Sequence, residues 1–354
     1  MRKPSRKQLN NLFFVVGLTA VVVMMLTFDV SLAELWHHLC HAGYWLVPII
    51  TVWTLVYALN ALAWQTIIRS KAVSGGQQVG FVRIYKLTVT GYALNYATPV
   101  GGLGGEPYRI VELSKDIGSQ QATSTVILYA MMHFFAHFWF WFASIFIYLA
   151  LVAMADMPLT TPIAGVLTLT AAFCTAAFVV FAKGYRQGLV VKTLRWAARV
   201  PGLKGWCSRF SQRHADALGS IDRQIASLYT ADRKAFYTSL LLEFLSRVVQ
   251  SCEVFFMLLL FGIDGGGTGT GLLVTFLDSM LIVAFTTLFA NVIGFLPMQL
   301  GSQEGGFVIS IAALGLEAAI GIFVSIVCRV REVVWIVVGL LLMRLPSPAG
   351  NDRF

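Results

Sequence analysis

Two long apolar stretches of the chain carry the same unusual pair, a proline followed seven residues later by a glutamate. Pro99 precedes Glu106, Pro297 precedes Glu304, and glycines surround both pairs. Proline stops helices and hydrocarbon rejects a carboxylate, so each stretch is predicted to break within the membrane. Paired breaks of this kind build the central binding sites of membrane transporters.

The first break offers groups that could bind a phosphate or an ammonium group. A half-helix predicted to begin near Pro107 directs free N–H groups and its positive dipole end toward the break. Arg109 lies one turn further and could hold a phosphate through two hydrogen bonds. Glu106 and Glu304 could face an ammonium group, hold Arg109 or exchange protons; alternatively, each simply caps a half-helix. The candidate substrate-binding residues are Asn95, Pro99, Gly101, Gly102, Gly105, Glu106, Arg109, Arg247, Pro297, Gly301, Glu304 and Arg329.

Further charged residues fall within apolar segments of the second half of the chain. Glu243 and Arg247 are four residues apart, which would let them neutralise each other on one helix face. The others have two interpretations, because charges this deep either line a polar path or form internal ion pairs. They are Glu253, Arg329, Arg331 and Glu332.

Histidines suggest a rival kind of site. His133 and His137 are four residues apart, as two metal ligands on one helix would be. No carboxylate accompanies them and aromatic residues surround them, so we interpret them as lipid-facing or packing residues. The five cysteines have no paired spacing. No metal, cofactor or disulfide framework is therefore predicted.

Composition identifies the elements that must position these groups. Apolar residues make up 57% of the chain and charged residues 12%, whereas soluble domains carry about 25% charged residues. The chain is therefore predicted to be an all-α polytopic membrane protein. A helix needs roughly 20 apolar residues to cross the hydrocarbon core. This predicts full spans at 11–28, 45–68, 122–151, 162–182, 236–261 and 318–343, and broken, re-entrant hairpins at 84–118 and 272–317.

The positions of lysine and arginine predict the orientation. Of the 26 such residues, all but Arg247, Arg329 and Arg331 fall in segments that share one face, if the first hairpin returns to its own side. Positive residues favour the cytoplasmic face, so both termini are placed there. The net charge of +9 therefore reflects topology, and no nucleic-acid partner is predicted. The basic segment 183–235 is expected to contain an amphipathic helix resting on anionic inner-leaflet lipids.

This topology divides the chain into two inverted repeats and their connections. Residues 45–151 and 236–344 are the repeats, each with one hairpin between two spans. Residues 1–44 form an N-terminal helix and external loop, 152–235 a connecting helix and the basic segment, and 345–354 a cytoplasmic tail. The first apolar run is longer than the core of a signal peptide, so residues 1–33 are expected to be retained.

Together these motifs resemble the transmembrane domain of the lysylphosphatidylglycerol synthase/flippase family, from about residue 10 to 344. The resemblance depends on Pro99-x3-Leu103-Gly-Gly-Glu106-Pro with Arg109, on Gly294-Phe-Leu-Pro297-x3-Gly301-x2-Glu304, and on Arg329. It implies movement of lipids between leaflets, including aminoacylated phosphatidylglycerol; stand-alone relatives are linked to glycolipid, polyprenyl-lipid or hopanoid handling. The chain departs from the family at Ser302-Gln303, where an apolar residue and an arginine are common. It also ends without a soluble acyltransferase-like domain.

The expected function is a lipid flippase of the bacterial inner membrane. Two hairpins meeting at the midplane would bind a phosphate-bearing lipid and expose it to each leaflet in turn. An enzyme is not expected, because no cytoplasmic segment is large enough for aminoacyl transfer. The alternatives are a membrane subunit of a lipid- or envelope-glycan-modifying system and an intramembrane enzyme with Glu106 or Glu304 as base. A homo-oligomer is left open, and head-group binding is expected mainly in the first half because Gln303 is uncharged.

Overall fold

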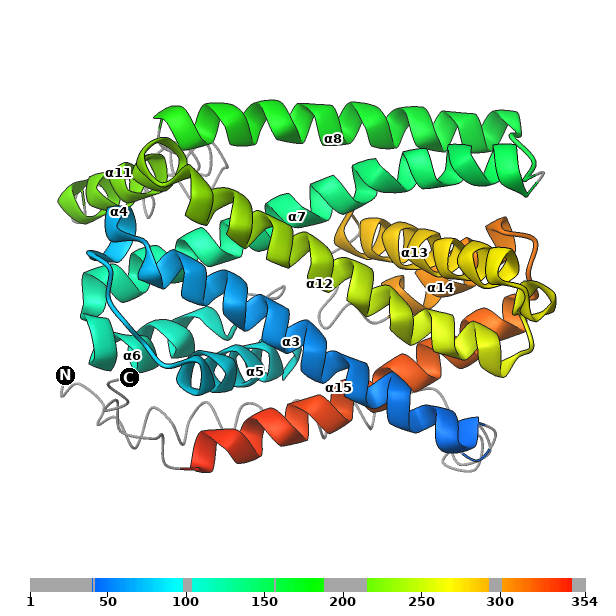
Figure 1. The fold of residues 1–354 in the computed structure, drawn as a ribbon, viewed down its shortest axis with the longest axis horizontal. Helices are drawn as coiled ribbons and strands as arrows, with labels where there is room; N and C mark the ends of the chain where they lie inside the picture. Colours follow the sequence, from blue (N-terminus) through cyan, green and yellow to red (C-terminus); the bar gives the residue numbers. More distant parts are fainter. Residues whose placement is uncertain are drawn as a thin grey trace.

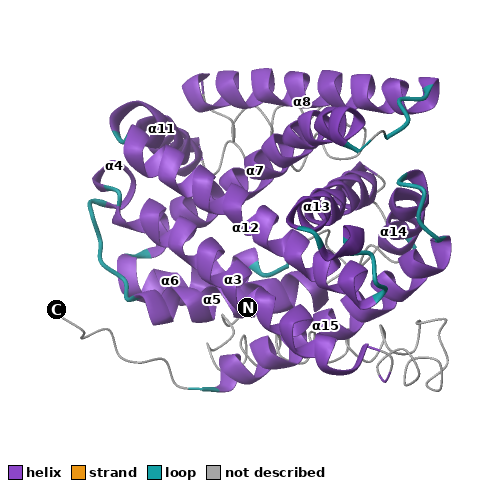
Figure 2. Cartoon of the chain, turned by 45° about the vertical axis from the view of Figure 1, so that its right-hand side comes forward, coloured by secondary structure: helices purple, strands orange, loops and turns teal. Residues whose placement is uncertain are grey.

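The computed structural model describes residues 40, 42–97, 104–155, 157–187, 215–292 and 301–345, and every regular element among them is helical (Figure 2). The predicted span 11–28 lies outside the described residues. The elements are η1 (Gly43–Trp45), α3 (Leu46–Arg69), α4 (Lys71–Ser74), α5 (Phe81–Ala97), α6 (Glu106–Ile117), α7 (Ser119–Met154), α8 (Thr161–Gln187), α11 (Ala215–Ala231), α12 (Arg233–Leu260), η2 (Gly265–Gly267), α13 (Gly269–Val292), α14 (Ser302–Ala313) and α15 (Ala318–Arg344).

Two antiparallel helices, α3 and α12, cross the middle of the molecule and pack along each other (Figure 1). Their paired ends are joined by side chains. The hydroxyl of Ser70, just past α3, donates to Asp232 Oδ2 at 2.7 Å. Asp232 also caps α12, because its Oδ1 accepts from the backbone N–H of Ala235 at 3.1 Å. This contact fixes the register of the central pair, since a capping carboxylate cannot slide along the helix.

The two breaks predicted from the sequence fall between separate helices. The first separates α5, which ends at Ala97, from α6, which begins at Glu106. The second separates α13, which ends at Val292, from α14, which begins at Ser302. The α5–α6 pair and the α13–α14 pair lie toward opposite ends of the central helices (Figure 1).

Packing around the two breaks follows a matching pattern. In the first half, α3 packs against α5 and α6 against α7; in the second half, α12 packs against α13 and α14 against α15. The halves also exchange contacts, because α5 packs against α15 and α13 against α7. Each broken pair is thus held both by its own half and by the last long helix of the other half.

Apolar side chains form two main cores, one toward each broken pair. The first gathers residues of α3, α5, α6 and α7 around Trp64 and Tyr129. The second gathers residues of α12, α13, α14 and α15 around Phe307 and Phe323. Burial of this kind contributes about 25 cal/mol for each Å² removed from water in a soluble protein, whereas in lipid close packing takes over that role.

Helix lengths fit a multi-pass membrane protein. Four helical stretches within the described residues are long and apolar enough to cross a membrane: Gly43–Arg69, Ser119–Met154, Thr161–Lys183 and Gly269–Val292. The other two expected spans are also continuous helices, α12 with 28 residues and α15 with 27, but both carry several charged residues. Among the four helices long enough to cross a membrane, α13 was not expected. It is a continuous helix of 24 residues, where one limb of a hairpin was predicted. The re-entrant course of both hairpins stays a prediction.

The basic connecting segment contains an amphipathic helix, as predicted, in α11. Its Leu218 and Leu228 are buried. Leu228 belongs to the first apolar core, and α11 packs against α4 and α8. At these two residues the apolar face of α11 is therefore covered by protein, and contact with anionic lipids stays a prediction.

We predict that Gly339→Ala destabilises the protein because α5 and α15 approach each other closely there. A Cβ atom at Gly339 would lie 2.4 Å from Ala93 Cβ and 3.1 Å from the carbonyl oxygen of Val89. Overpacking of this kind costs about 1–3 kcal/mol. The matched control is Gly165→Ala in α8, where a Cβ meets nothing within 4 Å and a helical alanine should add about 0.5–1 kcal/mol. Thermal unfolding in detergent should shift in opposite directions; equal shifts would contradict the packing.

Candidate functional site

A cavity of about 410 Å³ lies where the two broken pairs meet the central helices. This volume is within the range of small-molecule sites in proteins. Side chains from both halves line it, including nearly every intramembrane charge that the sequence singled out. The lining includes Trp53, Asn60, Tyr92, Asn95, Tyr96, Glu106, Arg109, Tyr129, His133, His137, Arg247, Gln250, Glu253, Thr286, Thr287, Asn291, Gln303, Arg329, Arg331 and Glu332.

Asn95 organises the first half of the site by joining the end of α5 to the start of α6. Its Oδ1 accepts from the backbone N–H of Gly105 at 2.6 Å, and its Nδ2 donates to Glu106 Oε1 at 3.3 Å. Arg109 Nη1 donates to the same Glu106 oxygen at 2.9 Å. The carboxylate is therefore held by two elements, although its Oε2, also buried, has no hydrogen-bond partner among the described residues.

Gly105 is required by the close approach of α6 to α5. A Cβ atom there would lie 2.0 Å from the carbonyl oxygen of Gly91, and a Cβ at Gly91 would lie 2.0 Å from Arg109 Nε. No side chain fits such contacts. The role of Gly105 is thus to bring the α6 terminus against α5, in agreement with a geometric rather than a recognition function for this glycine.

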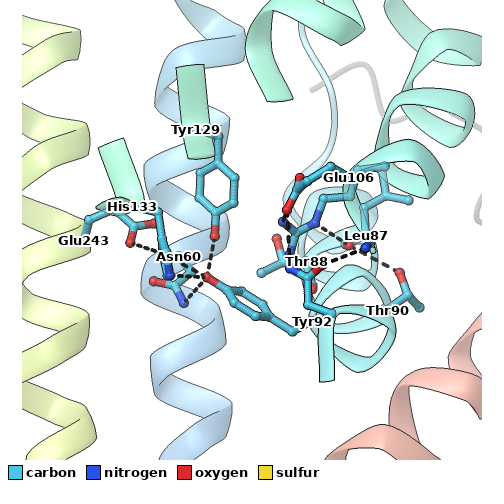
Figure 3. Close-up of polar contacts among 12 residues, drawn as sticks. Asn60, Leu87, Thr88, Thr90, Tyr92, Glu106, Tyr129, His133 and Glu243 are labelled. Atoms are coloured by element: carbon cyan, nitrogen blue, oxygen red, sulfur yellow. Dashed lines mark hydrogen bonds and ion pairs between the residues drawn. The ribbon is translucent and has the colours of Figure 1, made fainter. Parts of the chain in front are cut away.

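Arg109 is more buried than an arginine that is free to bind a phosphate would be. Its side chain is 1% exposed, and its Nη2 donates to the carbonyl oxygen of Thr88 at 3.2 Å. The guanidinium lies 4.8 Å from the ring centroid of Tyr92 and 5.3 Å from that of Tyr129. Figure 3 shows these rings beside the Glu106 cluster. In this conformation Arg109 neutralises and positions Glu106, and its direct contact with a phosphate stays a prediction.

The second half places a glutamate and an arginine together by a different route. Glu304 Oε2 accepts from the backbone N–H of Gly301 at 2.8 Å, so this carboxylate caps α14. Gly301 has a φ of +80°, which favours glycine. Arg329 from α15 donates to Glu304 Oε1 through Nε at 2.8 Å. The capping interpretation therefore holds for Glu304, whereas Glu106 contacts Asn95 and Arg109 instead.

Further ion pairs extend from α15 into the cavity. Arg329 Nη1 donates to Glu332 Oε2 at 2.8 Å, and Gln303 Nε2 donates to Glu332 Oε1 at 3.2 Å. Gln303, the departure from the family motif, thus supports the arginine network from α14. Arg329 thus places a positive charge in the second half although position 303 carries none, and head-group binding mainly in the first half stays a prediction.

Glu253 of α12 contacts side chains of two other helices, α3 and α15. Its Oε1 accepts from Arg331 Nε at 2.9 Å and its Oε2 from Trp53 Nε1 at 2.8 Å. The Arg331 guanidinium lies 3.9 Å from the Trp53 ring centroid. These deep charges form internal ion pairs that also line the cavity, and a polar path through them stays a prediction.

His133 and His137 are not lipid-facing, so that half of the interpretation is wrong, whereas both do pack against aromatic rings. Both line the cavity, because α12 and α3 pack against α7 and Tyr92 of α5 contacts His133. His133 Nδ1 lies 2.8 Å from Glu243 Oε2 and 2.7 Å from Arg247 Nη2. Glu243 and Arg247 approach to 3.5 Å, as their spacing predicted. The described residues contain no group of three His, Cys, Asp or Glu side chains that could hold a metal ion.

Most of the predicted site residues are brought together. Asn95, Glu106, Arg109, Arg247 and Arg329 line the cavity. Gly105, Gly301 and Glu304 support it from the starts of α6 and α14. Pro99, Gly101, Gly102 and Pro297 lie outside the described residues. Trp53, Tyr92 and Tyr129 also line the cavity, although they carry no signal of their own in the sequence. The spacing of four between His133 and His137 was the available signal for their place in the site.

Charge pairing determines what this arrangement can do chemically. Every arginine lining the cavity contacts a glutamate of the described residues. An anionic ligand must therefore compete with a carboxylate for its arginine, or arrive with a proton that neutralises that carboxylate.

Comparison with known proteins gives one match. Residues 13–340 match the family model described as the lysylphosphatidylglycerol synthase TM region. No curated protein and no solved structure was found to match the chain.

We predict that Glu253→Gln destabilises the protein by about 3–5 kcal/mol, because it removes the closer countercharge of the buried Arg331 and leaves only Glu332 at 3.8 Å. Glu253→Gln/Arg331→Met should cost less than the single change, since it removes the unpaired charge. Asp116→Asn is the control, because Asp116 pairs with Arg83 at a more exposed site, where ion pairs contribute about 0–1 kcal/mol. Unfolding in detergent would test this; a double variant less stable than Glu253→Gln would argue against a paired charge.

Proposed function

Because the chain belongs to the lysylphosphatidylglycerol synthase TM region family, we propose that it is a flippase that moves a phosphate-bearing lipid between membrane leaflets. The observation that carries this proposal is the cavity shared by both broken pairs, lined by arginine–glutamate pairs. A lipid phosphate can replace a carboxylate at an arginine, because both are oxyanions that accept two N–H donors. Candidate lipids are an aminoacylated phosphatidylglycerol, a glycolipid and a polyprenyl lipid.

The matching packing of the two halves supports alternating access. Each half places a long helix beside a broken pair and a second long helix beyond it, which is the pattern of an inverted repeat with its site at the repeat interface. We propose that α5–α6 and α13–α14 are re-entrant hairpins entering from opposite faces. Rocking of one half against the other would then open the cavity to each leaflet in turn.

The outer surface supports placement in a bilayer. Large apolar side chains of α8 are exposed, such as Leu169 at 72% and Phe173 at 44%. Water would disfavour such a surface, whereas lipid chains cover it without cost. With the lysine and arginine distribution, this supports a multi-pass protein of the bacterial inner membrane with both termini in the cytoplasm.

The two alternative functions, an intramembrane enzyme and a non-transporting subunit, require different properties of this cavity. An intramembrane enzyme would need Glu106 or Glu304 as a base, but Glu304 is engaged by Gly301 and Arg329. A non-transporting membrane subunit would not need charges reachable from both leaflets. Mass spectrometry of lipids before and after incubation with the purified protein separates an enzyme from a carrier, since a carrier leaves its lipid unchanged.

We predict that Glu106→Gln and Arg329→Gln slow lipid exchange between leaflets by about tenfold or more, in line with the 1–3 kcal/mol of a lost charge-assisted hydrogen bond. The measurement is quenching of fluorescent phosphatidylglycerol in proteoliposomes. Asp116→Asn is the matched control, because Asp116 lies on α6 with Glu106 but contacts Arg83 outside the cavity. Control and site variants with equal exchange rates would contradict the assigned site; no exchange above that of empty liposomes for any candidate lipid would contradict the function.

A further inference from the structure

Arg247 is the least firmly paired of the arginines that line the cavity. Its closest carboxylate oxygen, Glu243 Oε2, is 3.5 Å away. For Arg109, Arg329 and Arg331 the corresponding distances are 2.9, 2.8 and 2.9 Å. Its Nε has no hydrogen-bond partner among the described residues, and its Nη1 reaches Gln250 only at 3.5 Å. The strongest contact of this guanidinium is with His133.

His133 lies between Glu243 and Arg247. Its Nδ1 is 2.8 Å from Glu243 Oε2, and Arg247 Nη2 is 2.7 Å from Nδ1 and 2.8 Å from Nε2. A guanidinium only donates hydrogen bonds and an ionised carboxylate only accepts them. With its proton on Nδ1, the neutral ring donates to Glu243 and offers Nε2 as the acceptor for Arg247. In this state the negative charge of Glu243 is relayed through the ring to Arg247.

One added proton breaks this relay wherever it binds in the pair. On Nε2 the added proton would point at an N–H group of Arg247, so that two donors would face each other. The ring would then carry a second positive charge beside the guanidinium. On Glu243 it would remove the only negative charge of the cluster. Glu243 is fully buried and its Oε1 has no hydrogen-bond partner among the described residues, so the added proton has an acceptor ready. In either case the cluster gains one positive charge, and Glu243 no longer neutralises Arg247 fully.

The other carboxylates that line the cavity, Glu106, Glu253 and Glu332, are already paired with other arginines. Around His133, α3 supplies Asn60, α5 supplies Tyr92, α7 supplies Tyr129 and His137, and α6 supplies the already paired Glu106 and Arg109 (Figure 3). From α13 the cavity is lined by Thr286 and Thr287, and the acidic Asp278 is not among the lining residues. A protonated cluster therefore carries one net positive charge in a buried cavity, which an anion would neutralise.

We infer that the His133–Glu243 pair is a proton-binding site whose occupancy releases Arg247 to bind an anionic lipid head group. Proton and anion would then bind together, because each removes the charge that opposes the other. By thermodynamic linkage the effect is reciprocal: the anion favours proton uptake by the same factor that the proton favours the anion. If the chain is the proposed flippase, on which this step rests, the proton is its coupling ion and the lipid is anionic.

Isothermal titration calorimetry on the full chain in nonionic detergent tests this linkage. The probe is dihexanoylphosphatidylglycerol, titrated in buffers of different ionisation enthalpy between about pH 5 and 8, where histidine changes charge. We expect uptake of up to about one proton per probe bound, and affinity rising by up to about tenfold per pH unit as the pH falls. Dihexanoylphosphatidylcholine, which carries no net charge, should bind without proton uptake. Binding of the anionic probe without proton uptake would overturn the inference.

Three variants test the roles separately. Glu243→Gln resembles the protonated state and should bind the anionic probe as tightly at about pH 8 as the wild type does at about pH 5. His133→Gln should lose proton uptake, whereas Asp116→Asn, outside the cavity, should retain it. Arg247→Gln should bind the probe at least tenfold more weakly at low pH. Unchanged pH dependence in both His133→Gln and Glu243→Gln would overturn the assignment of the proton to this pair.

Further outcomes distinguish the proton linkage from the lipid assignment and from the proposed flippase function. Proton uptake with inorganic phosphate but not with the lipid probe would overturn the lipid assignment. Proton uptake without lipid exchange in proteoliposomes would contradict the flippase and leave the linkage standing. Lipid exchange that is independent of pH, with no proton uptake on binding, would contradict the linkage alone.

Discussion

Buried arginine needs a countercharge, and this constraint organises the centre of the protein. A guanidinium taken out of water loses hydration worth several kcal/mol, which only close carboxylates can offset. Glu253 therefore ties α12 to Arg331 of α15 and to Trp53 of α3. Arg329 likewise ties α15 to Glu304 at the start of α14. The Arg329–Glu304 contact holds the second broken pair against α15, whereas Glu106 of the first pair meets Arg109 on its own helix and Asn95 of α5.

The same constraint determines how the cavity can meet a ligand. Its arginines are neutralised before any ligand arrives, so binding is an exchange of partners rather than the filling of a free site. The relay through His133 makes one of these exchanges depend on a proton, since Arg247 reaches its carboxylate mainly through the imidazole ring. Close glycine contacts such as that of Gly105 with Gly91 bring the remaining groups within hydrogen-bonding distance.

Sequence reasoning succeeded where the signal was local. The breaks between Ala97 and Glu106 and between Val292 and Ser302 were visible because proline, glycine and glutamate interrupt apolar runs. It failed for His133, because helical spacing shows which residues share a face but not what covers that face. The neighbouring aromatic residues pointed to lipid, whereas α12 packs over His133 and brings Glu243 to it from 110 residues away.

By itself, the sequence determined the class of the protein, its family and the residues that form the two breaks, since composition and local motifs carry that information. Only the tertiary structure decided which charges on different helices neutralise each other. Trp53 and Glu253 are 200 residues apart, and Gln303 and Glu332 belong to different helices. Coulomb attraction depends on distance in space, and no periodicity along the chain records that distance.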